Sequence, residues 1–478
     1  MNTKILTDMR KNLLLFVAAA LLMACNASNP SDPWKQADKI VKEMTKVHFP
    51  DYTVSIVDYG AVANDPNSPC HEAINLAIVE TSLKGGGTVE VPDGDWYTGP
   101  ITLKSNVNLH LADNATLKFL TDVDLYFPAV RTRWEGVDVN NAHPLIYAYG
   151  ETNIALTGNG TIDGQASRDN WWRLQAYNER IGHYLNDDEK AEFIAPSRLE
   201  LLKWGEAEIP VYERNTTPEN TLRPQTVNFT LCKTVLIEGV TLLRSPFWVL
   251  HPLLCEDLIV RNVTVDNDGP NGDGCDPESC KNVLIEGCTF NTGDDCIAIK
   301  SGRNKDGRRW GVPSENIVVR NCNMANGHGG VTIGSEISGG YRNLYVSNCK
   351  MDSPHLDVVL RIKTSTARGG VIENIWFKDV EVGTCGGAIA SVNLLYEPRE
   401  VAERGFIPTV RNVNMENVTC TKAENALVID GLENPENVSD IHIKNCTFDG
   451  VANGNSLRGA YRNVTFENCT INGELFNM

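Results

Sequence analysis

Asn282-Val-Leu-Ile-Glu-Gly-Cys288 and, 34 residues further on, Asn316-Ile-Val-Val-Arg-Asn-Cys322 are two copies of one pattern. Each copy opens a short strand with alternate residues facing inward, then reaches a turn pair and another small apolar residue. The pattern recurs at intervals of 23 to 38 residues from about residue 234 onward. Further copies begin at Thr234, Asp257, Asn343, Asn374, Asn412, Asp440 and Asn463. A repeat of this length predicts a solenoid.

The strands are short and rich in β-branched residues, and neither a leucine-rich pattern nor helical periodicity is present. We therefore predict an all-β fold, a right-handed single-stranded parallel β-helix, with stacked Asn side chains satisfying backbone groups at the turns. A short helix over Cys70 to Leu83 should cap its N-terminal end. Between about residues 165 and 223 the repeat lapses, which indicates helices and loops inserted into the solenoid. Such an insertion lies on the binding face or serves packing alone.

The first 24 residues are typical of a bacterial lipoprotein signal peptide. Lys4, Arg10 and Lys11 precede an apolar run of eleven residues, which is too short to span a bilayer. The run ends in Leu22-Met23-Ala24-Cys25, which predicts Cys25 as a lipidated residue; an ordinary signal peptide is the alternative. Residues 25–50 would form a linker with a short helix, and residues 51–478 the β-helix domain. We expect an exported protein of the periplasm or outer membrane, held there by its lipid.

Net charge is −18, which argues against nucleic-acid binding. Thirteen Cys follow Cys25, and several occupy equivalent repeat positions, as Cys288 and Cys322 do. This spacing favours small residues stacked inside a solenoid over a disulfide framework, although a bridge between Cys275 and Cys280 remains open. No Cys pair has the spacing of a zinc site.

Aligning the repeats on their second strand brings Cys275, Ile297, Val331 and Leu360 into register. Asp273 and Asp295 then stand two residues before their strands, while Asp294 and His328 stand three before theirs. Neighbouring turns of a parallel solenoid lie about 4.8 Å apart, so these four side chains should converge. Arg361 and Lys363 would project from the next turn.

Three carboxylates this close repel one another, and one must take up a proton. A protonated carboxyl beside a carboxylate is what acid/base hydrolysis of a glycosidic bond uses. Taken singly, Gly272-Asp-Gly and Gly293-Asp-Asp also suit turns or cation ligands. On consecutive turns beside His328 and two cations, they predict a catalytic centre.

Asn271-Gly-Asp-Gly, Gly293-Asp-Asp-Cys, Gly327-His-Gly-Gly and Arg361-Ile-Lys, in this order, resemble the four signature segments of the polygalacturonase family, glycoside hydrolase family 28. The resemblance implies Asp294 as the general acid and Asp273 with Asp295 as the residues that activate water. It implies that His328 supports the acid, and that Arg361 and Lys363 bind a galacturonate carboxylate. Tyr396 resembles a substrate-binding tyrosine of the family.

Two points depart from simple expectation. Gly272 stands where many family members have Thr, a change that should leave the carboxylates unaltered. Carboxylates on adjacent turns would be about 5 Å apart, and this separation usually accompanies retention of configuration. The resemblance instead implies an inverting, metal-independent reaction without a cofactor, and we follow the resemblance.

Other residues indicate how substrate is held. Arg303, Lys305, Arg308 and Arg309 follow the Asp294-Asp295 strand and could attract an anionic sugar chain. The segment Ser245-Pro-Phe-Trp-Val-Leu-His-Pro resembles one in bacterial exo-acting members, so Trp248 and His251 are candidates for lining the substrate site. We expect exo action, because the insertion and this basic segment would close one end of the groove.

The expected partner is therefore a pectic polysaccharide or oligogalacturonide. Rhamnogalacturonan is an alternative substrate within the same family. A β-helix lyase that uses Ca²⁺ and a non-catalytic glycan-binding solenoid are alternatives from other classes. The sequence does not indicate an oligomeric state.

Overall fold

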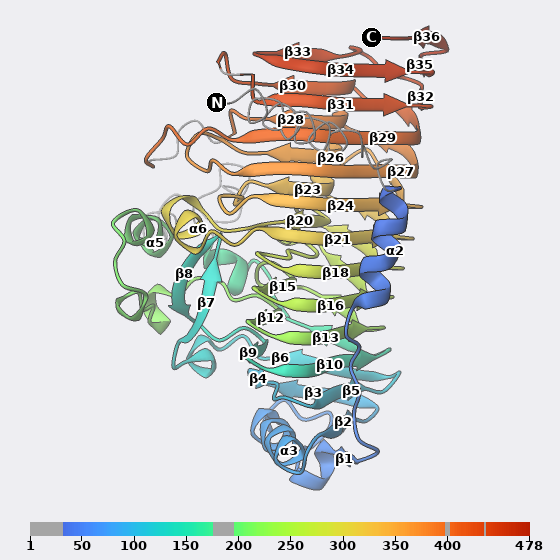
Figure 1. Cartoon of the computed structure of the whole chain (residues 1–478). Coiled ribbons are helices and arrows are strands. Elements are labelled where there is room, and N and C mark those ends of the chain that lie inside the picture. The colour runs from blue at the N-terminus through green and yellow to red at the C-terminus, as the bar shows by residue number, and fades with distance from the viewer. Residues whose placement is uncertain (1–31, 175–195, 397–401, 435) are drawn as a thin grey trace, which may run out of the picture.

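The computed structural model describes residues 32–174, 196–396, 402–434 and 436–478, and it is a long parallel β-helix (Figure 1). The predicted all-β solenoid is thus confirmed. The signal segment with Cys25 lies outside the described residues. Among the helices that are described, none has the length and apolar character needed to cross a membrane.

Three stacks of parallel strands run along the solenoid. Most coils of the chain, each called a rung here, contribute a strand to all three stacks. The outer stack contains β1 (Thr53–Ser55), β2 (Gly87–Val91), β5 (Val107–Leu111), β10 (Thr152–Gly158), β13 (Lys233–Glu238), β16 (Glu256–Arg261), β18 (Lys281–Glu286), β21 (Ser314–Arg320), β24 (Tyr341–Ser347), β27 (Val371–Cys385), β29 (Thr409–Lys422), β31 (Val438–Lys444) and β34 (Tyr461–Glu467). The long strands β27 and β29 continue into the second, lateral stack. The lateral stack also contains β3 (Gly94–Thr98), β6 (Ala115–Phe119), β11 (Thr161–Asp163), β14 (Thr241–Leu243), β17 (Thr264–Asn267), β19 (Thr289–Thr292), β22 (Asn323–Asn326), β25 (Lys350–Ser353), β32 (Thr447–Phe448) and β35 (Cys469–Ile471).

The third stack, called the site stack below, carries the candidate catalytic residues. It contains β4 (Ile101–Thr102), β9 (Ile146–Tyr149), β12 (Val227–Thr230), β15 (Leu250–Leu253), β20 (Ile297–Ile299), β23 (Gly329–Gly334), β26 (Val358–Lys363), β28 (Ala388–Asn393), β30 (Asn425–Asp430) and β33 (Ser456–Arg458). Between β15 and β20 the stack continues only through isolated bridges at Cys275 and Glu278. The rung that supplies Asp273 therefore has no regular strand in this stack.

Asparagine ladders hold the turns of successive rungs together. Asn316 donates a side-chain hydrogen bond to Asn282 at 3.0 Å, and Asn343 donates to Asn316 at 2.9 Å. Asn374 and Asn412 extend the same ladder. All these residues have a positive φ, which Asn tolerates better than other residues with side chains. This is why the repeat opens on Asn.

The core is a continuous column of inward-facing Val, Ile, Leu and Cys side chains. Every described Cys is buried and free, so the position shared by Cys288 and Cys322 is a packing position. Cys275 and Cys280, for which the sequence left a bridge open, are both free thiols. The thiol of Cys280 instead donates to the carbonyl of Pro252.

Helices cover the N-terminal end and one side of the solenoid. Helix α3 (His71–Leu83) caps the first rungs with Ile74, Ala77 and Ile78. Helix α2 (Pro33–Glu43) begins at the N-cap Asp32 and packs Ile40 against the outer stack (Figure 1). At the other end, β36 (Glu474–Phe476) pairs antiparallel with β35.

The remaining elements project from the solenoid beside the site stack (Figure 1). They are the hairpin of β7 (Val130–Trp134) and β8 (Val137–Asn141), the helices α5 (Pro196–Glu206) and α6 (Asn304–Trp310), and the 3-10 turns η2 (Val123–Tyr126), η3 (Trp171–Leu174), η4 (Val211–Glu213) and η5 (Pro218–Asn220). The 3-10 turn η1 (Ile56–Tyr59) instead lies beside α3 at the N-terminal end. Both η1 and η2 precede the hairpin in the chain, and η3, α5, η4 and η5 fall between residues 165 and 223. Of the predicted insertion, residues 175–195 lie outside the described residues.

Candidate active site

Four consecutive rungs of the site stack position the candidate residues. Cys275 pairs with Ile297, Ile297 with Val331, and Val331 with Leu360. This is the register that the sequence repeats predict. Because residues at equivalent distances before these strands stack on one another, the acids and His328 come from different rungs to one place.

Asp273, Asp294 and Asp295, called the acid cluster below, converge just before their strands begin. One carboxylate oxygen from each of the three residues lies within 4.8 Å of the other two. Asp295 is fully buried and Asp273 nearly so, whereas 21% of the Asp294 side chain is exposed. Asp294 is therefore the acid that a substrate can reach most directly.

Glycines leave the room in which this cluster sits. A Cβ on Gly329 would lie 2.6 Å from the Oδ1 atom of Asp295, so a side chain there would displace the carboxylate. A Cβ on Gly272 would lie 2.3 Å from the Nδ2 atom of Asn267. The departure from Thr at Gly272 thus reflects local packing, and it places no side chain among the carboxylates.

His328 contacts the exposed member of the cluster. Its Nδ1 atom lies 3.1 Å from Asp294 Oδ1, and its backbone N–H donates to the Asp294 carbonyl at 2.9 Å. The two residues occupy equivalent positions on adjacent rungs, as the sequence alignment indicates. The structure thus places His328 where it can orient and charge-stabilise Asp294.

The predicted cations lie on the next rung and contact Asp295. Lys363 Nζ is 2.7 Å from Asp295 Oδ2, and Arg361 Nη1 is 3.5 Å from Asp295 Oδ1. Arg361 keeps 22% of its side chain exposed. Tyr396 lies beside this pair, with its ring centroid 5.4 Å from Lys363 Nζ. Arg361, Lys363 and Tyr396 therefore form one border of the acid cluster.

The pKa values of Asp273 and Asp294 are shifted in opposite directions. Burial, followed by the charge of Asp294, raises the pKa of Asp273 to about 8. Burial also disfavours the charged form of Asp294, but the hydrogen bond and charge of His328, together with the charges of Lys363 and Lys300, outweigh burial and hold the Asp294 pKa below its usual range. That same hydrogen bond raises the pKa of His328. Since the groups are coupled, the acid cluster holds one proton up to about pH 8.

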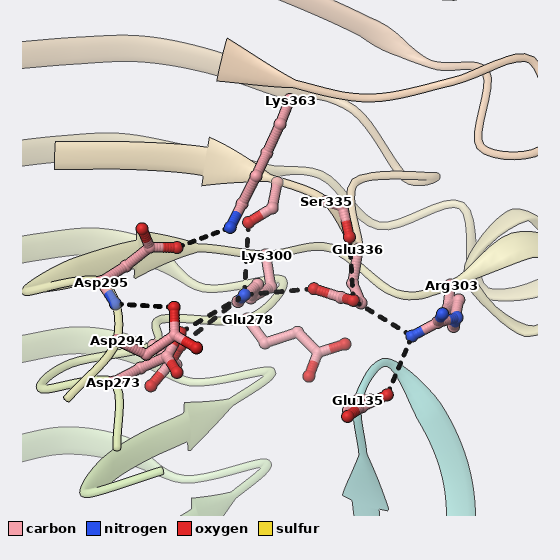
Figure 2. A network of polar contacts seen from close by, with 12 residues as sticks. Glu135, Asp273, Glu278, Asp294, Asp295, Lys300, Arg303, Ser335, Glu336 and Lys363 are labelled. Atoms are coloured by element: carbon pink, nitrogen blue, oxygen red, sulfur yellow. Dashed lines mark hydrogen bonds and ion pairs between the residues drawn. The ribbon is translucent and has the colours of Figure 1, made fainter. Parts of the chain in front are cut away.

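The sequence reasoning missed a second set of charged residues behind the cluster (Figure 2). Lys300 Nζ lies 3.7 Å from Asp273 Oδ2, 3.9 Å from Asp276 Oδ1 and 3.1 Å from Glu336 Oε2. Asp276 is fully buried, and burial followed by the charge of Asp273 raises its pKa well above the usual range. The signal was present, since Lys300 stands two rungs from Lys363 at an outward-facing position of the aligned strands.

His251 and Trp248 do not line an open site. His251 has no exposed surface, and its Nε2 atom lies 2.8 Å from Glu278 Oε2. Trp248 is buried, stacks on Phe247 and has Lys300 Nζ 4.8 Å from its ring. The prediction of direct substrate contact is therefore wrong for His251 in this structure. Both residues are covered by the hairpin β7–β8 and its neighbours, which the sequence pattern of the repeats does not describe.

The basic segment after β20 is not a solvated loop but helix α6, and its cations are already paired. Arg303 contacts Glu135 at 3.1 Å and Glu336 at 3.2 Å. Arg309 contacts Asp138 at 2.7 Å, and Arg308 donates to the Ala367 carbonyl. Lys305 lies between Glu208 and Glu403 at 3.8 and 3.7 Å. These contacts hold α6 to its surroundings. Arg309 still keeps 44% of its side chain exposed, and its contact with an anionic chain stays a prediction.

A buried ion network ties the projecting elements to the site stack. Arg133 of the hairpin contacts Glu278 at 2.9 Å and Asp138 at 3.0 Å. In the inserted segment, Arg214 contacts Asp306 of α6 at 2.5 Å. Burial opposes the charge of Glu278, but Arg133 and His251 outweigh it and lower the Glu278 pKa. The hairpin, the described part of the insertion and α6 thus form one wall, called the side wall below.

Among the described residues, the side wall covers the site stack on the β12–β15 side of the acid cluster. In β12 and β15 every residue is buried, including the outward-facing Asn228 and His251. In β28 and β30, on the other side, the outward-facing Ser391, Asn393 and Val428 are partly exposed. A chain lying on this stack would meet a closed end beyond Asp273 and an open end beyond Arg361.

The three carboxylates of the acid cluster lie close enough together to hold a metal ion. Among the described residues, no other group of acids, His or Cys converges in this way. Lys300, Arg361 and Lys363 already bring three positive charges to the acid cluster. Because the protein's own cations balance the carboxylates, the cluster fits acid/base chemistry by side chains better than a site built for a divalent cation.

Paired carboxyl groups, one holding a proton, on the outward face of a parallel β-helix define a candidate carbohydrate-cleaving enzyme. The chain belongs to the glycosyl hydrolases family 28, whose family model matches residues 205–470. It is accordingly a glycoside hydrolase.

Individual relatives agree with this placement. The chain is 39% identical to a hyperthermoactive exopolygalacturonase from Thermotoga maritima of known crystal structure, with a TM-score of 0.83 over 93% of this chain and 97% of that one. It is 25% identical over 461 residues to an exo-poly-alpha-D-galacturonosidase of Dickeya chrysanthemi, covering 87% of this chain and 75% of the relative. It is also 25% identical over 360 residues to an endo-polygalacturonase of Pectobacterium parmentieri, covering 73% and 76%. The relatives therefore include both exo- and endo-acting enzymes.

Proposed function

We propose that the protein hydrolyses α-1,4-galacturonosidic bonds of homogalacturonan or oligogalacturonides, and that it removes residues from a chain end. The observation that carries the substrate class is the position of Arg361 and Lys363 beside the acid cluster, where they can bind the carboxylate of a galacturonate unit. The names of the relatives support the same substrate.

In this proposal Asp294 donates a proton to the leaving glycosidic oxygen. His328 holds the carboxyl group of Asp294 in place. In the resting cluster the proton is on Asp273, and it can pass to Asp294 because carboxylate oxygens of the cluster lie within 4.8 Å of one another. Asp273 and Asp295 then carry the negative charge that accepts a proton from the attacking water. Lys363, with its Nζ atom 2.7 Å from Asp295 Oδ2, holds the carboxylate of Asp295 in place.

The reaction is proposed to invert configuration, although carboxylates this close usually accompany retention. Inversion requires that water enters among the acids and attacks the anomeric carbon directly, with no bond between enzyme and sugar. Proton NMR of the first product formed from an α-linked substrate decides this point. The β-anomer supports inversion, whereas an initial α-anomer would mean that one Asp acts as a nucleophile.

Exo action is supported by the side wall, which covers β12 and β15 but leaves β28 and β30 open. A substrate chain can then extend in one direction only. The test is a time course on oligogalacturonides labelled at the reducing end. Monomer released from the first minutes, with the label kept on the shortening chain, supports attack from the non-reducing end; an early ladder of product sizes means endo action.

The same experiment, repeated on rhamnogalacturonan, distinguishes the alternative substrate within the family. Release of galacturonate from that polymer alone would replace homogalacturonan as the proposed substrate. An unsaturated product that absorbs in the ultraviolet and disappears with EDTA would instead indicate a lyase reaction.

We further propose that the protein is exported and attached to a membrane by a lipid on Cys25, in the periplasm or at the outer membrane. The support is the segment Leu22-Met23-Ala24-Cys25 after an apolar run. Mass spectrometry of the mature N-terminus tests this proposal. An acylated Cys25 supports it, while cleavage at another site without a lipid, or an unchanged fractionation of Cys25→Ser, contradicts it.

A further inference from the structure

Lys300 is a buried cation that none of the proposed catalytic steps uses. It follows β20 and lies in register with Glu278 on one side and Gly334 on the other. Lys363 occupies the next position of the same column, beyond Gly334. Because Gly334 has no side chain, the two ammonium groups can both turn toward the acid cluster (Figure 2).

The position of the Lys300 ammonium is held from several directions. It donates to the Gly334 carbonyl at 3.2 Å and to Glu336 at 3.1 Å, and it lies 4.8 Å from the centre of the Trp248 ring. Only 4% of its side chain is exposed. Burial disfavours its charge, but Glu336, Asp273 and Asp276 outweigh burial and raise the pKa of Lys300. The ammonium therefore stays charged over the pH range in which Asp273 titrates.

Lys300 and the predicted cations serve different acids. Arg361 and Lys363 contact Asp295, whereas Lys300 is 3.7 Å from Asp273. A positive charge at this distance in a buried site lowers the pKa of a carboxyl by about 1 to 3 units. The charged and titratable groups that face Lys300 or Asp273 from the surrounding elements are Arg223, His251, Asp276, Asp294, Asp295, Glu336 and Lys363.

We propose that Lys300, held in place by Glu336, is a positioning residue that sets the pH range over which the acid cluster keeps its shared proton. The inference rests on the proposed hydrolysis for its catalytic consequence. Lys300 itself touches no reacting atom. It acts through Asp273, since its charge keeps the proton on the cluster weakly enough bound to be passed to Asp294; the proton taken from the attacking water then restores the resting cluster.

The test is the pH dependence of kcat/KM for trigalacturonate between pH 4 and 10, in the parent and in four variants. In the parent, activity should fall as pH rises through about 8, where the cluster loses its shared proton. Lys300→Met removes a positive charge, so the proton is held more tightly and this alkaline limb should move upward by about 1 pH unit or more. Lys300→Arg keeps the charge and should leave the limb near its parent position, whatever its effect on kcat.

Glu336→Gln provides a change of opposite sign. Without the Glu336 carboxylate, the Lys300 ammonium is less neutralised, and the alkaline limb should move to lower pH. Lys281→Met, on the outer stack, removes an ammonium that is 50% exposed and should move nothing. A loss of kcat in Lys300→Met with an unmoved limb would overturn the proposal, as would equal shifts in Lys300→Met and Lys281→Met.

A second measurement separates this inference from the proposed function. Carbon-13 NMR of labelled Asp carboxyl groups, without substrate, follows the titration of Asp273 directly. A higher midpoint in Lys300→Met and a lower one in Glu336→Gln would support the role of Lys300 even if the enzyme cleaves no galacturonide. Unchanged midpoints would refute it even if hydrolysis is confirmed. If Lys300→Met does not fold, the other two variants test the proposal. Glu336→Gln should move the alkaline limb to lower pH, and Lys300→Arg should leave it in place.

Discussion

The outer stack and the site stack carry charged ladders on the same rungs, but the order of charges along them differs. On the outer stack Glu238, Arg261, Glu286 and Arg320 alternate in sign from rung to rung. Burial opposes the charge of Glu286, but Arg320 and Arg261 outweigh it and lower the Glu286 pKa. In the acid cluster, carboxyl groups follow one another on adjacent rungs, and the pKa of Asp273 rises to about 8. The same strand geometry thus produces an inert ladder or a proton-holding site, depending on which charges are neighbours.

Burial makes the difference larger. The side chains of the outer ladder keep 21% to 36% of their surface exposed, so water screens their charges. Those of Asp273, Asp295 and Lys300 keep 4% or less. Substitutions in the two regions should therefore differ in size and in kind, which gives four ways to test the comparison.

The largest effect is expected for Asp294→Asn. An amide cannot donate the proton that the leaving oxygen needs, so kcat on oligogalacturonides should fall by about 10² to 10⁴-fold. Steady-state kinetics measure this loss, with thermal unfolding showing that the fold is kept. Asp266→Asn, an exposed carboxylate of the lateral stack, is the matched control and should retain activity. Unchanged hydrolysis of every pectic substrate by Asp294→Asn would remove the catalytic assignment.

The next effect concerns stability and the side wall. Arg133→Met leaves the buried carboxylates of Glu278 and Asp138 without their shared partner, which should cost about 3 to 5 kcal/mol of unfolding free energy. Denaturant unfolding measures it. Arg131→Met is the control, because Arg131 also contacts Asp138 but is 30% exposed, and its loss should cost no more than about 1 kcal/mol. Equal losses in the two variants would show that burial does not govern this network.

A smaller effect is expected for Arg361→Ala. Loss of a charge-assisted hydrogen bond to the substrate carboxylate should lower kcat/KM by about 10- to 100-fold. The comparison is made on trigalacturonate and on its methyl ester. If Arg361 binds the carboxylate, the kcat/KM of the variant on the neutral ester should be close to that of the parent. An equal loss of kcat/KM on both substrates would mean that Arg361 contacts only Asp295 and does not bind the substrate carboxylate.

The smallest effect is expected in the outer ladder. Arg320→Gln breaks a partly exposed ion pair with Glu286, so the unfolding free energy should fall by about 1 kcal/mol or less, and less still at high salt. Activity should be unaffected. A loss as large as that of Arg133→Met would contradict the view that exposure separates the two regions.

The repeat pattern alone accounts for much of the site. Positions counted back from Cys275, Ile297 and Val331 place Asp273, Asp294, Asp295 and His328 together, because the rung spacing of a parallel stack converts sequence offsets into distances. The repeats also contain Lys300 at the position equivalent to Lys363. The sequence does not single out Lys300, because a lone Lys at the end of an apolar strand usually lies at the protein surface.

What the sequence by itself determined is therefore the solenoid, its register and the convergence of the acids. Only the tertiary structure decided that His251 is sealed from solvent, that α6 is held by ion pairs, and that Asp276 and Lys300 are buried behind Asp273. The reason is that a repeat fixes only the neighbours one rung away. Burial and pairing here come from elements outside the repeat, as when Arg133 meets Glu278 across 145 residues of sequence.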